Sequence, residues 1–331
     1  MSRILVVGGA GYIGSHMMKV LTQAGHEPVA FDNLSTGHAD AVMYGELVGG
    51  DLANRDQVAD VISQGRFDGV MHFASNIEVG ESVRNPRKYY TNNVVNTLNL
   101  IHAMMDQGLN HLIFSSTAAV FGIPQYTPID EDHPRRPINP YGQSKHIVET
   151  VLEDYRDSHG FSSTSLRYFN AAGADPDGEL GERHEPESHL VPLVIQAALG
   201  RRPDIKIYGT DYDTEDGTCV RDYVHVTDLC DAHLLAMTRL TGGDKGSAYN
   251  LGSGSGFTVR EVIETVREVS GRSFKVTETG RRPGDPGVLV ADASLAKTAL
   301  SWSPRRHQLS QIVGDAWNFY RHRDDWKRPA V

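Results

Sequence analysis

The chain has 331 residues, with 39% apolar side chains, 22% charged side chains and a formal net charge of −10. This length holds two domains or one large domain with an added lobe, and the apolar content suffices for a buried core, which excludes a disordered protein. The negative charge argues against nucleic acid or an anionic membrane as the main partner, because both require a basic face.

Membrane and secreted classes are also not expected. No apolar run reaches the roughly 18–20 residues of a membrane span, and the first residues lack the layout of a signal peptide. The two cysteines, Cys219 and Cys230, cannot build a disulfide framework and lack the spacing of a metal site. We therefore expect a cytoplasmic protein without a bound metal.

Short apolar runs alternate with helical patterns along the first half of the chain. The first run, Ile4 to Val7, is followed by glycines and by an amphipathic stretch from Ile13 to Ala24. Such alternation predicts an α/β fold in which helices cover both faces of a parallel sheet. Further strands are expected at 28–31, 47–49, 70–73, 112–115 and 164–166, with helices at 57–63, 91–106 and 141–157.

The alternation ends at residues 171–178, a Gly-, Pro- and Asp-rich stretch that is the best candidate for a domain boundary. Residues 1–172 are predicted to form a Rossmann-like, doubly wound parallel sheet, with a later return segment near 222–250. The remainder, 173–331, is expected to be a smaller mixed α/β substrate lobe. Its helical patterns lie at 190–199, 259–269 and 309–320.

A nucleotide-binding turn is predicted directly after the first strand. Its Gly-x-Gly-x-x-Gly pattern comprises Gly8, Gly9, Gly11 and Gly14, with Tyr12 and Ile13 inside it. Glycines there allow a tight turn and close approach to a pyrophosphate, which then faces the positive end of the following helix. Asp32 ends the second strand about 20 residues farther on, where a carboxylate binds ribose hydroxyls and repels a 2′-phosphate. These features predict NAD, rather than NADP, as the cofactor.

Tyr141 and Lys145 are four residues apart and therefore share one face of a helix. A nearby ammonium is expected to lower the pKa of the tyrosine from its ordinary value of about 10. Thr117, at the end of the preceding strand, is expected to hydrogen-bond a sugar hydroxyl and the tyrosine oxygen. The Tyr-x-x-x-Lys spacing alone is a common chance match. Beside the glycine turn and the Ser-Ser-Thr strand end, it predicts a tyrosine acid/base next to a redox cofactor.

Over essentially its whole length the chain resembles the UDP-glucose (UDP-galactose) 4-epimerase family of the extended short-chain dehydrogenase/reductases. The most specific stretch for this branch is 216–223, Asp-Gly-Thr-x-Val-Arg-Asp-Tyr. Further motifs that carry the resemblance are His72-Phe73-Ala74, Val79-Gly80-Glu81-Ser82, Tyr89-Tyr90-Thr91-Asn92-Asn93, Leu166-Arg167-Tyr168-Phe169-Asn170, Tyr249-Asn250-Leu251-Gly252 and Arg281-Arg282-Pro283-Gly284-Asp285.

The resemblance implies a mechanism. Tyr141 as phenolate takes the proton of the sugar 4-hydroxyl while hydride passes from C4 to NAD, the keto sugar turns, and hydride returns to the opposite face. The implied cofactor site adds Asn33, Asp51, Leu52, Phe73, Ala74, Asn93 and Tyr168 to the glycine turn, Asp32, Tyr141 and Lys145. The implied UDP-sugar site comprises Thr117, Tyr141, Asn170, His189, Leu190, Tyr208, Arg221, Tyr223, Arg282, Asp285 and Leu289.

Some of these residues also have simpler interpretations. For Arg221 and Arg282 the alternative is a surface ion pair with Asp222 or Asp285, and Tyr208 and Tyr223 are nearly as well explained as buried structural tyrosines. The two histidines of the motifs, His72 and His225, are assigned to structure. Relatives commonly form dimers through two helices, so a homodimer is expected here through 92–106 and 141–157.

The chain departs from the family pattern at several positions. Ile77 stands where many members carry a lysine, which removes a cationic contact to the cofactor phosphates. Thr117 replaces the commoner serine, and Ala119 and Phe121 replace a threonine and a tyrosine. Leu289 occupies a position where some relatives have a bulky tyrosine, so UDP-N-acetylhexosamines are expected to be tolerated.

Three alternatives remain. A UDP-xylose (UDP-arabinose) 4-epimerase differs only in the C5 substituent of its sugar. A nucleotide-sugar 4,6-dehydratase requires additional acid/base groups after the Ser-Ser-Thr strand, where this chain has Ala118 and Ala119. A non-catalytic NAD-binding regulator would be expected to lack Tyr141 or Lys145, and both are present.

Overall fold

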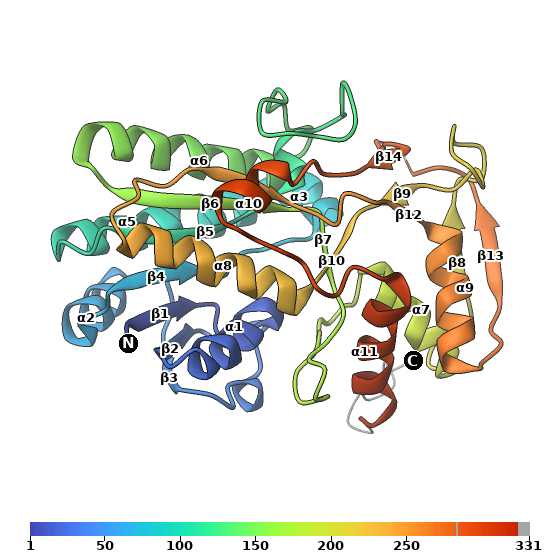
Figure 1. The fold of residues 1–331 in the computed structure, drawn as a ribbon, viewed down its shortest axis with the longest axis horizontal. Helices are drawn as coiled ribbons and strands as arrows, with labels where there is room; N and C mark the ends of the chain where they lie inside the picture. The colour runs from blue at the N-terminus through green and yellow to red at the C-terminus, as the bar shows by residue number, and fades with distance from the viewer. Residues whose placement is uncertain (283, 324–331) are drawn as a thin grey trace.

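Seven parallel strands form one sheet in the order β11-β6-β5-β4-β1-β2-β3 (Figure 1). The computed structural model describes residues 1–282 and 284–323. Pro283 of the Arg281–Asp285 motif and residues 324–331 of the predicted second domain lie outside the described residues. The strands are β1 (Arg3–Val7), β2 (Glu27–Asp32), β3 (Glu46–Gly49), β4 (Gly69–His72), β5 (His111–Thr117), β6 (Ser162–Tyr168) and β11 (Ala248–Leu251).

Helices bury both faces of this sheet (Figure 1). Alternate residues of β1 belong to different cores: Ile4 and Val6 pack on one face, Leu5 and Val7 on the other. This explains why β1 is apolar on both faces from Ile4 to Val7. The first face is covered by α1 (Tyr12–Gln23) and α8 (Val226–Thr241), and the second by α2 (Arg55–Gly65), α5 (Asn96–Asp106) and α6 (Pro140–His159).

Shorter elements connect these layers. Helices α3 (Val79–Arg84) and α4 (Pro86–Tyr89) precede a π-helical turn, η2 (Tyr90–Val95), which leads into α5. The 3-10 turns η1 (Ala39–Ala41) and η3 (Ala118–Val120) follow β2 and β5. The prediction of one helix over 91–106 therefore merges η2 and α5. The π-turn overlaps the Tyr-Tyr-Thr-Asn-Asn motif at residues 90–93, and such turns are frequent at functional sites.

A smaller lobe lies beside the carboxyl ends of the sheet strands (Figure 1). Its core contains Ile195, Val262 and Ile312, which come from α7 (Leu190–Ala198), α9 (Val259–Ser270) and α11 (Leu309–Arg321). The other elements are α10 (Ser294–Ala299) and the strands β7 (Asn170–Ala172), β8 (Ile205–Tyr208), β9 (Val220–Arg221), β10 (Tyr223–His225), β12 (Phe257–Thr258), β13 (Val276–Thr279) and β14 (Val288–Leu289).

The predicted fold class is confirmed, because the sheet is parallel, doubly wound and accompanied by a mixed lobe. Helix α8 and strand β11 return to the sheet after the smaller lobe has begun, and β11 pairs with β6. The domain boundary at residue 172 remains a prediction.

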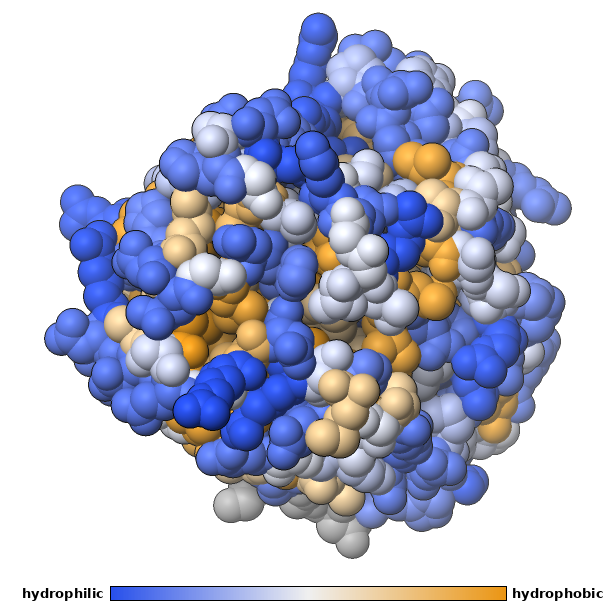
Figure 2. All heavy atoms as spheres, turned by 60° about the vertical axis from the view of Figure 1, so that its left-hand side comes forward, coloured by the Kyte–Doolittle hydropathy of each residue, from blue (hydrophilic) through white to orange (hydrophobic). Residues whose placement is uncertain are grey.

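The face displayed in Figure 2 is predominantly polar. Figure 2 shows hydrophobic residues in separate patches among hydrophilic ones on the face that it displays. Within residues 1–282 and 284–323, no helix is both long and apolar enough to cross a membrane.

Candidate active site

A large cavity lies where the carboxyl ends of the sheet strands meet the smaller lobe. It has a volume of about 740 Å³ and is bordered by the turn after β1, the end of β5, the start of α6 and the segment around β14. Strand β1 lies between β2 and β4, so the chain order reverses there, and such a switch point is where α/β sheets bind ligands.

Most of the predicted site residues line this one cavity. They are Gly8, Gly11, Tyr12, Ile13, Gly14, Asp32, Asn33, Asp51, Leu52, Phe73, Ala74, Thr117, Tyr141, Lys145, Tyr168, Asn170, His189, Arg221, Asp285 and Leu289. Asn93, Leu190, Tyr208, Tyr223 and Arg282 are not among the lining residues.

Backbone conformation and close backbone contacts both require glycine in the glycine turn. Gly8 has φ +82°, a conformation that other residues rarely adopt, and a Cβ there would lie 2.6 Å from the backbone nitrogen of Ala74. A Cβ on Gly14 would lie 2.1 Å from the carbonyl oxygen of Gly8. The backbone therefore leaves an open cradle at the amino end of α1, which fits a dinucleotide pyrophosphate.

Asp32 is held rigidly beside this cradle. Its carboxylate accepts hydrogen bonds from the backbone nitrogens of Ala10 (3.0 Å) and Leu34 (2.8 Å). Next to it, the amide of Asn33 donates to Asp51 at 3.0 Å. Each carboxylate oxygen accepts more than one bond, so Asp32 retains capacity for ribose hydroxyls. A carboxylate that accepts hydrogen bonds at this position fits the ribose hydroxyls of NAD.

Local sequence places Tyr141 in the first turn of α6. The side chain of Asn139 caps the helix by accepting from the nitrogen of Gly142 at 2.9 Å, and Pro140 occupies the first helical position. A Cβ on Gly142 would lie only 2.4 Å from the carbonyl oxygen of Ala119, so glycine lets the helix approach η3. Tyr141 is thereby brought to the end of β5, where Thr117 lies.

Lys145 lies one turn farther along α6 and is buried. Its ammonium donates to the carbonyl oxygen of Ser115 at 2.8 Å and lies 4.8 Å from the ring centre of Phe114. Burial lowers the pKa of Lys145 from 10.5 to about 7, although the charge of Glu149 acts in the opposite direction. This lysine therefore changes charge near neutral pH.

The pKa of Tyr141 shifts in the direction opposite to the sequence prediction. Burial raises its pKa above 10.0, while a hydrogen bond with Thr117 lowers it, and Lys145 is not among the groups that shift it. Burial of the phenolate dominates, and the lowering of the Tyr141 pKa by the ammonium that the sequence predicts is not found.

A buried ionic network that sequence reasoning missed lies behind Lys145. Glu149, which is 1% exposed, accepts from Arg167 at 2.8 and 2.9 Å and from Ser116 at 2.5 Å. Arg135 adds a further contact to Glu149 at 3.2 Å. These bonds connect α6 to β5 and β6 and fix the helix that carries Tyr141.

Two other polar contacts lie nearby, and the first of them supports the same helix. Asn93 is buried behind the wall of the cavity, where its amide donates to Ser144 at 3.0 Å and its oxygen accepts from the nitrogen of Asn76 at 2.9 Å. The hydroxyls of Ser115 and Tyr168 form a short hydrogen bond. Ser115 was not predicted, although it belongs to the same Ser-Ser-Thr strand end as Thr117.

The far end of the cavity is formed by the smaller lobe. Arg221 bonds the carbonyl oxygens of Val220 and Pro286 at 2.9 and 3.0 Å, so its head is held by backbone and makes no ion pair with Asp222. Leu289 in β14 pairs with Arg221 in β9 and also faces the cavity.

The remaining predicted residues of this lobe lie elsewhere. Arg282 stacks on the ring of Tyr208 at 3.8 Å. Tyr223 is buried in the core of the lobe, and burial raises its pKa. Leu190 begins α7. Binding roles for these residues, and for Asn93, remain predictions.

The two motif histidines have structural partners. The Nε2 atom of His72 lies 2.8 Å from Thr97 Oγ1, and burial lowers the pKa of His72 to about 3. His225 caps α8 by accepting from the nitrogen of Thr227 at 3.1 Å. Both cysteines, Cys219 and Cys230, are buried and unpaired.

Comparisons with known proteins agree with this geometry. The model of the NAD dependent epimerase/dehydratase family matches residues 4–252. The UDP-glucose 4-epimerase of Rhizobium meliloti is 48% identical over 323 residues, covering 98% of each chain. The crystal structure of UDP-glucose 4-epimerase from Brucella ovis in complex with NAD has a TM-score of 0.94 at 45% identity, covering 96% of this chain and 98% of that one.

A further solved structure is the UDP-Glc/GlcNAc 4-epimerase from Campylobacter jejuni. Its TM-score is 0.86 at 43% identity, covering 97% of this chain and 99% of that one. Since the family model spans well over half of the sequence and the relatives cover nearly all of it, the chain belongs to the NAD dependent epimerase/dehydratase family.

Proposed function

We propose that this protein catalyses the reversible NAD-dependent 4-epimerisation of UDP-glucose and UDP-galactose. The observation that carries the proposal is that Tyr141, Thr117 and Lys145 line the same cavity as the glycine cradle and Arg221. Relatives of nearly equal length and 45–48% identity that carry the name UDP-glucose 4-epimerase support it.

The chain's own residues divide the work. Tyr141 removes the proton of the sugar 4-hydroxyl and returns it after the sugar has turned, and Thr117 orients that hydroxyl toward the tyrosine oxygen. Lys145 donates to the carbonyl oxygen of Ser115 at 2.8 Å and so fixes the helix that carries Tyr141 against the strand that carries Thr117. Arg221 binds the diphosphate and fixes one end of the substrate. The glycine cradle and Asp32 would hold NAD, which would supply a reversible hydride acceptor for C4.

The turn after Thr117 favours epimerisation over elimination. Thr117 accepts a hydrogen bond from the nitrogen of Ala119 at 3.1 Å, and η3 continues with Ala118 and Ala119, which carry no acid or base. A 4,6-dehydratase would need such a group to expel the C6 hydroxyl. Tyr141 of α6 is therefore the acid/base that we propose beside Thr117.

Leu289 supports a second substrate class. It lines the cavity from β14, and a leucine leaves more room than a tyrosine for a 2-acetamido group. The Campylobacter jejuni relative is named a UDP-Glc/GlcNAc 4-epimerase. We therefore include UDP-N-acetylhexosamines among the proposed substrates; nothing in the cavity favours UDP-xylose or UDP-arabinose over hexoses.

We further propose a cytoplasmic homodimer, formed through α5 and α6. These helices lie together on one face of the sheet, and His102 of α5 contacts the hydroxyl of Tyr155 of α6 at 2.9 Å. Light scattering after gel filtration tests the dimer; a monomer mass near the calculated 36.4 kDa would contradict it.

The function is tested by incubating the purified protein with UDP-galactose, without added NAD, and following the sugar signals by proton NMR. UDP-glucose at a stable mixture of both sugars is expected. A 4-keto-6-deoxy product would indicate a dehydratase, and unchanged substrate for every UDP-sugar, even with NAD added, would support a regulatory protein.

A further inference from the structure

Lys19 is a buried lysine that contacts three carboxylates. It lies on α1, and its side chain is only 6% exposed. Its ammonium donates to Asp175 at 2.8 and 3.0 Å, to Asp177 at 2.7 Å and to Glu179 at 2.8 Å. These partners lie 156, 158 and 160 positions farther along the chain. The bonds therefore join the helix that begins at the glycine turn to the segment between β7 and α7.

The three carboxylates belong to one small hairpin. Its base is an antiparallel bridge between Ala174 and Gly181, and the nitrogen of Asp175 donates to the carbonyl oxygen of Leu180 at 2.9 Å. The turn closes where the nitrogen of Gly178 donates to the carbonyl oxygen of Asp175 at 2.8 Å. We call residues 174–181 the acidic hairpin. Its backbone bonds bring carboxylates from three alternate positions to one ammonium.

Charge makes this contact depend on the lysine. Carboxylate oxygens of the three acids lie within 4.8 Å of one another. Burial alone would lower the pKa of Lys19, but the hydrogen bonds to the three carboxylates outweigh it and raise the pKa above its ordinary 10.5. Lys19 is therefore charged at neutral pH. Without its ammonium the three like charges would repel one another, and the hairpin would lose its hold on α1.

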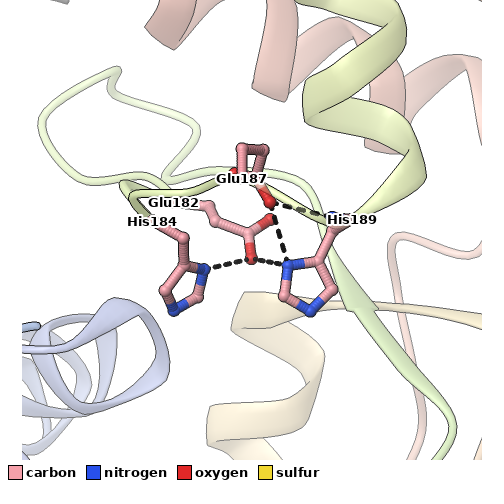
Figure 3. Close-up of side chains that lie close together, drawn as sticks. All are labelled: Glu182, His184, Glu187 and His189. Atoms are coloured by element: carbon pink, nitrogen blue, oxygen red, sulfur yellow. Dashed lines mark hydrogen bonds and ion pairs between the residues drawn. The ribbon is translucent and has the colours of Figure 1, made fainter. Parts of the chain in front are cut away.

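The residues that follow the acidic hairpin reach the active-site cavity. We call residues 182–189 the cavity segment, and its members Glu182, His184 and His189 line the cavity. Figure 3 shows that these side chains contact one another: Glu182 Oε1 lies 3.0 Å from His184 Nδ1 and 2.8 Å from His189 Nδ1. The cavity segment is thus braced internally. Its place at the cavity depends on how the hairpin at its start is held.

Other contacts at this junction are neutral or exposed. The hydroxyl of Tyr12 donates to the carbonyl oxygen of Gly173 at 2.8 Å, just before the hairpin. Arg183 pairs with Asp40 at 2.8 Å, but the Asp40 side chain is 58% exposed, and such surface pairs add little. The hydroxyl of Tyr44 donates to Glu179 at 2.6 Å. Lys19 supplies the buried positive charge of the junction.

We propose that Lys19 is a positioning residue for the UDP-sugar, because it holds the acidic hairpin on α1 and thereby sets the place of the cavity segment. Lys19 and its three partners are not among the residues that line the cavity, so the effect passes through the cavity segment. The inference rests on the proposed UDP-sugar function of this cavity. The glycine cradle should be unaffected, because Lys19 lies about 10 Å along α1 from its first residue.

The test compares Lys19→Met with the unchanged protein. Methionine keeps an unbranched apolar stem and removes the charge, and Lys297→Met, at an exposed lysine of α10, is the matched control. UDP affinity is measured by calorimetry, NAD per chain after desalting, and KM and kcat by epimerisation of UDP-galactose. In Lys19→Met, KM and the Kd for UDP are expected to rise about ten-fold or more. Retained NAD should be unchanged, and kcat should change by less than about three-fold.

These results separate positioning from a purely structural role. A lysine needed only for folding would lower UDP affinity, retained NAD and kcat together, and that result would overturn the proposal. Unchanged UDP affinity in folded Lys19→Met would overturn it as well. If the unchanged protein does not epimerise UDP-galactose, but Lys19→Met still weakens UDP binding, the proposed function fails and the role of Lys19 stands.

A second variant keeps the test valid if Lys19→Met does not fold. Lys19→Met leaves Asp175, whose side chain is 5% exposed, as a buried carboxylate without its cation. Lys19→Met/Asp175→Asn removes that charge too but still lacks the ammonium that holds the hairpin. It is expected to show the same rise in KM and faster trypsin cleavage after Arg183, at the start of the cavity segment. Cleavage and KM equal to those of the unchanged protein would overturn the proposal.

Discussion

The ammonium of Lys145 donates a hydrogen bond of 2.8 Å to the main-chain carbonyl oxygen of Ser115, the residue two positions before Thr117. This bond connects the helix that carries Tyr141 directly to the strand that carries its hydroxyl neighbour. It also holds a titratable lysine in a site where burial brings its pKa to about 7. Function here has a cost in stability, because a charge is placed where solvent is excluded.

Lys145→Met is expected to stabilise the cofactor-depleted protein while it lowers turnover by at least about 100-fold. The folded-state pKa of about 7 lies below the ordinary 10.5, so burying the charged form is unfavourable at any pH below about 7. That penalty falls as pH rises from about 7 to 10.5. Urea unfolding at pH 6.5 and pH 9 should show a larger gain at pH 6.5; an equal gain at both would contradict the lowered pKa.

Thr117→Val is expected to lower kcat by about 10- to 100-fold, because it removes the hydroxyl that bonds Tyr141 and that we propose orients the sugar, but keeps the branched shape. Thr117→Ser is the matched control, since it keeps the hydroxyl and removes only the methyl group. Steady-state kinetics with UDP-galactose distinguish the two. Comparable activity of the Thr117→Val variant and the unchanged protein would exclude a catalytic hydroxyl at this position.

Gly142→Ala should weaken the active site through packing alone. The added Cβ would lie 2.4 Å from the carbonyl oxygen of Ala119 and force α6 away from η3. We expect a loss of about 1–3 kcal/mol in the free energy of unfolding and a drop in kcat. Gly314→Ala in α11 is the control, because nothing lies within 4 Å of its Cβ and helix propensity predicts a gain of up to about 1 kcal/mol.

Leu289→Tyr is expected to separate the two proposed substrate classes. A larger side chain on β14 would narrow the cavity where the sugar substituent is proposed to lie. Turnover of UDP-N-acetylglucosamine should fall by about ten-fold or more, whereas turnover of UDP-galactose should change little. If the unchanged protein does not convert UDP-N-acetylglucosamine, or if both activities fall equally, Leu289 does not determine this specificity.

Much of the fold was predictable because its signals are local. The glycine turn lies between a buried strand and an amphipathic helix, Asp32 follows the second strand, and Tyr141 and Lys145 share a single helix. Each of these relationships spans a few residues and depends on backbone geometry. The structure places all of them at one cavity.

Helix α8 was not predicted as a separate element because its buried face is partly polar. Asp228 is buried and accepts from the backbone nitrogens of Arg305 and Arg306 at 2.9 and 2.8 Å, and His233 is buried against the carbonyl oxygen of Leu229 at 2.8 Å. These side chains interrupt the apolar periodicity, and the partners of Asp228 are distant in sequence.

Glu149 illustrates the same limit within the site. In the sequence it resembles an ordinary surface glutamate on an amphipathic helix. Its partners Arg167 and Ser116 come from two different strands, so only the folded chain shows that it is a buried anion. The contacts of Glu182 with His184 and His189 were missed for a related reason, because a loop has no periodicity from which side-chain directions can be inferred.

Reversible hydride transfer at C4 is tested most directly with UDP-galactose that carries deuterium at C4, incubated with the purified protein in ordinary water. The proposed mechanism predicts UDP-glucose that retains the deuterium at C4, and no product from Tyr141→Phe, which removes the acid/base hydroxyl. Product in which C4 carries hydrogen from solvent would contradict the mechanism, as would full activity of Tyr141→Phe.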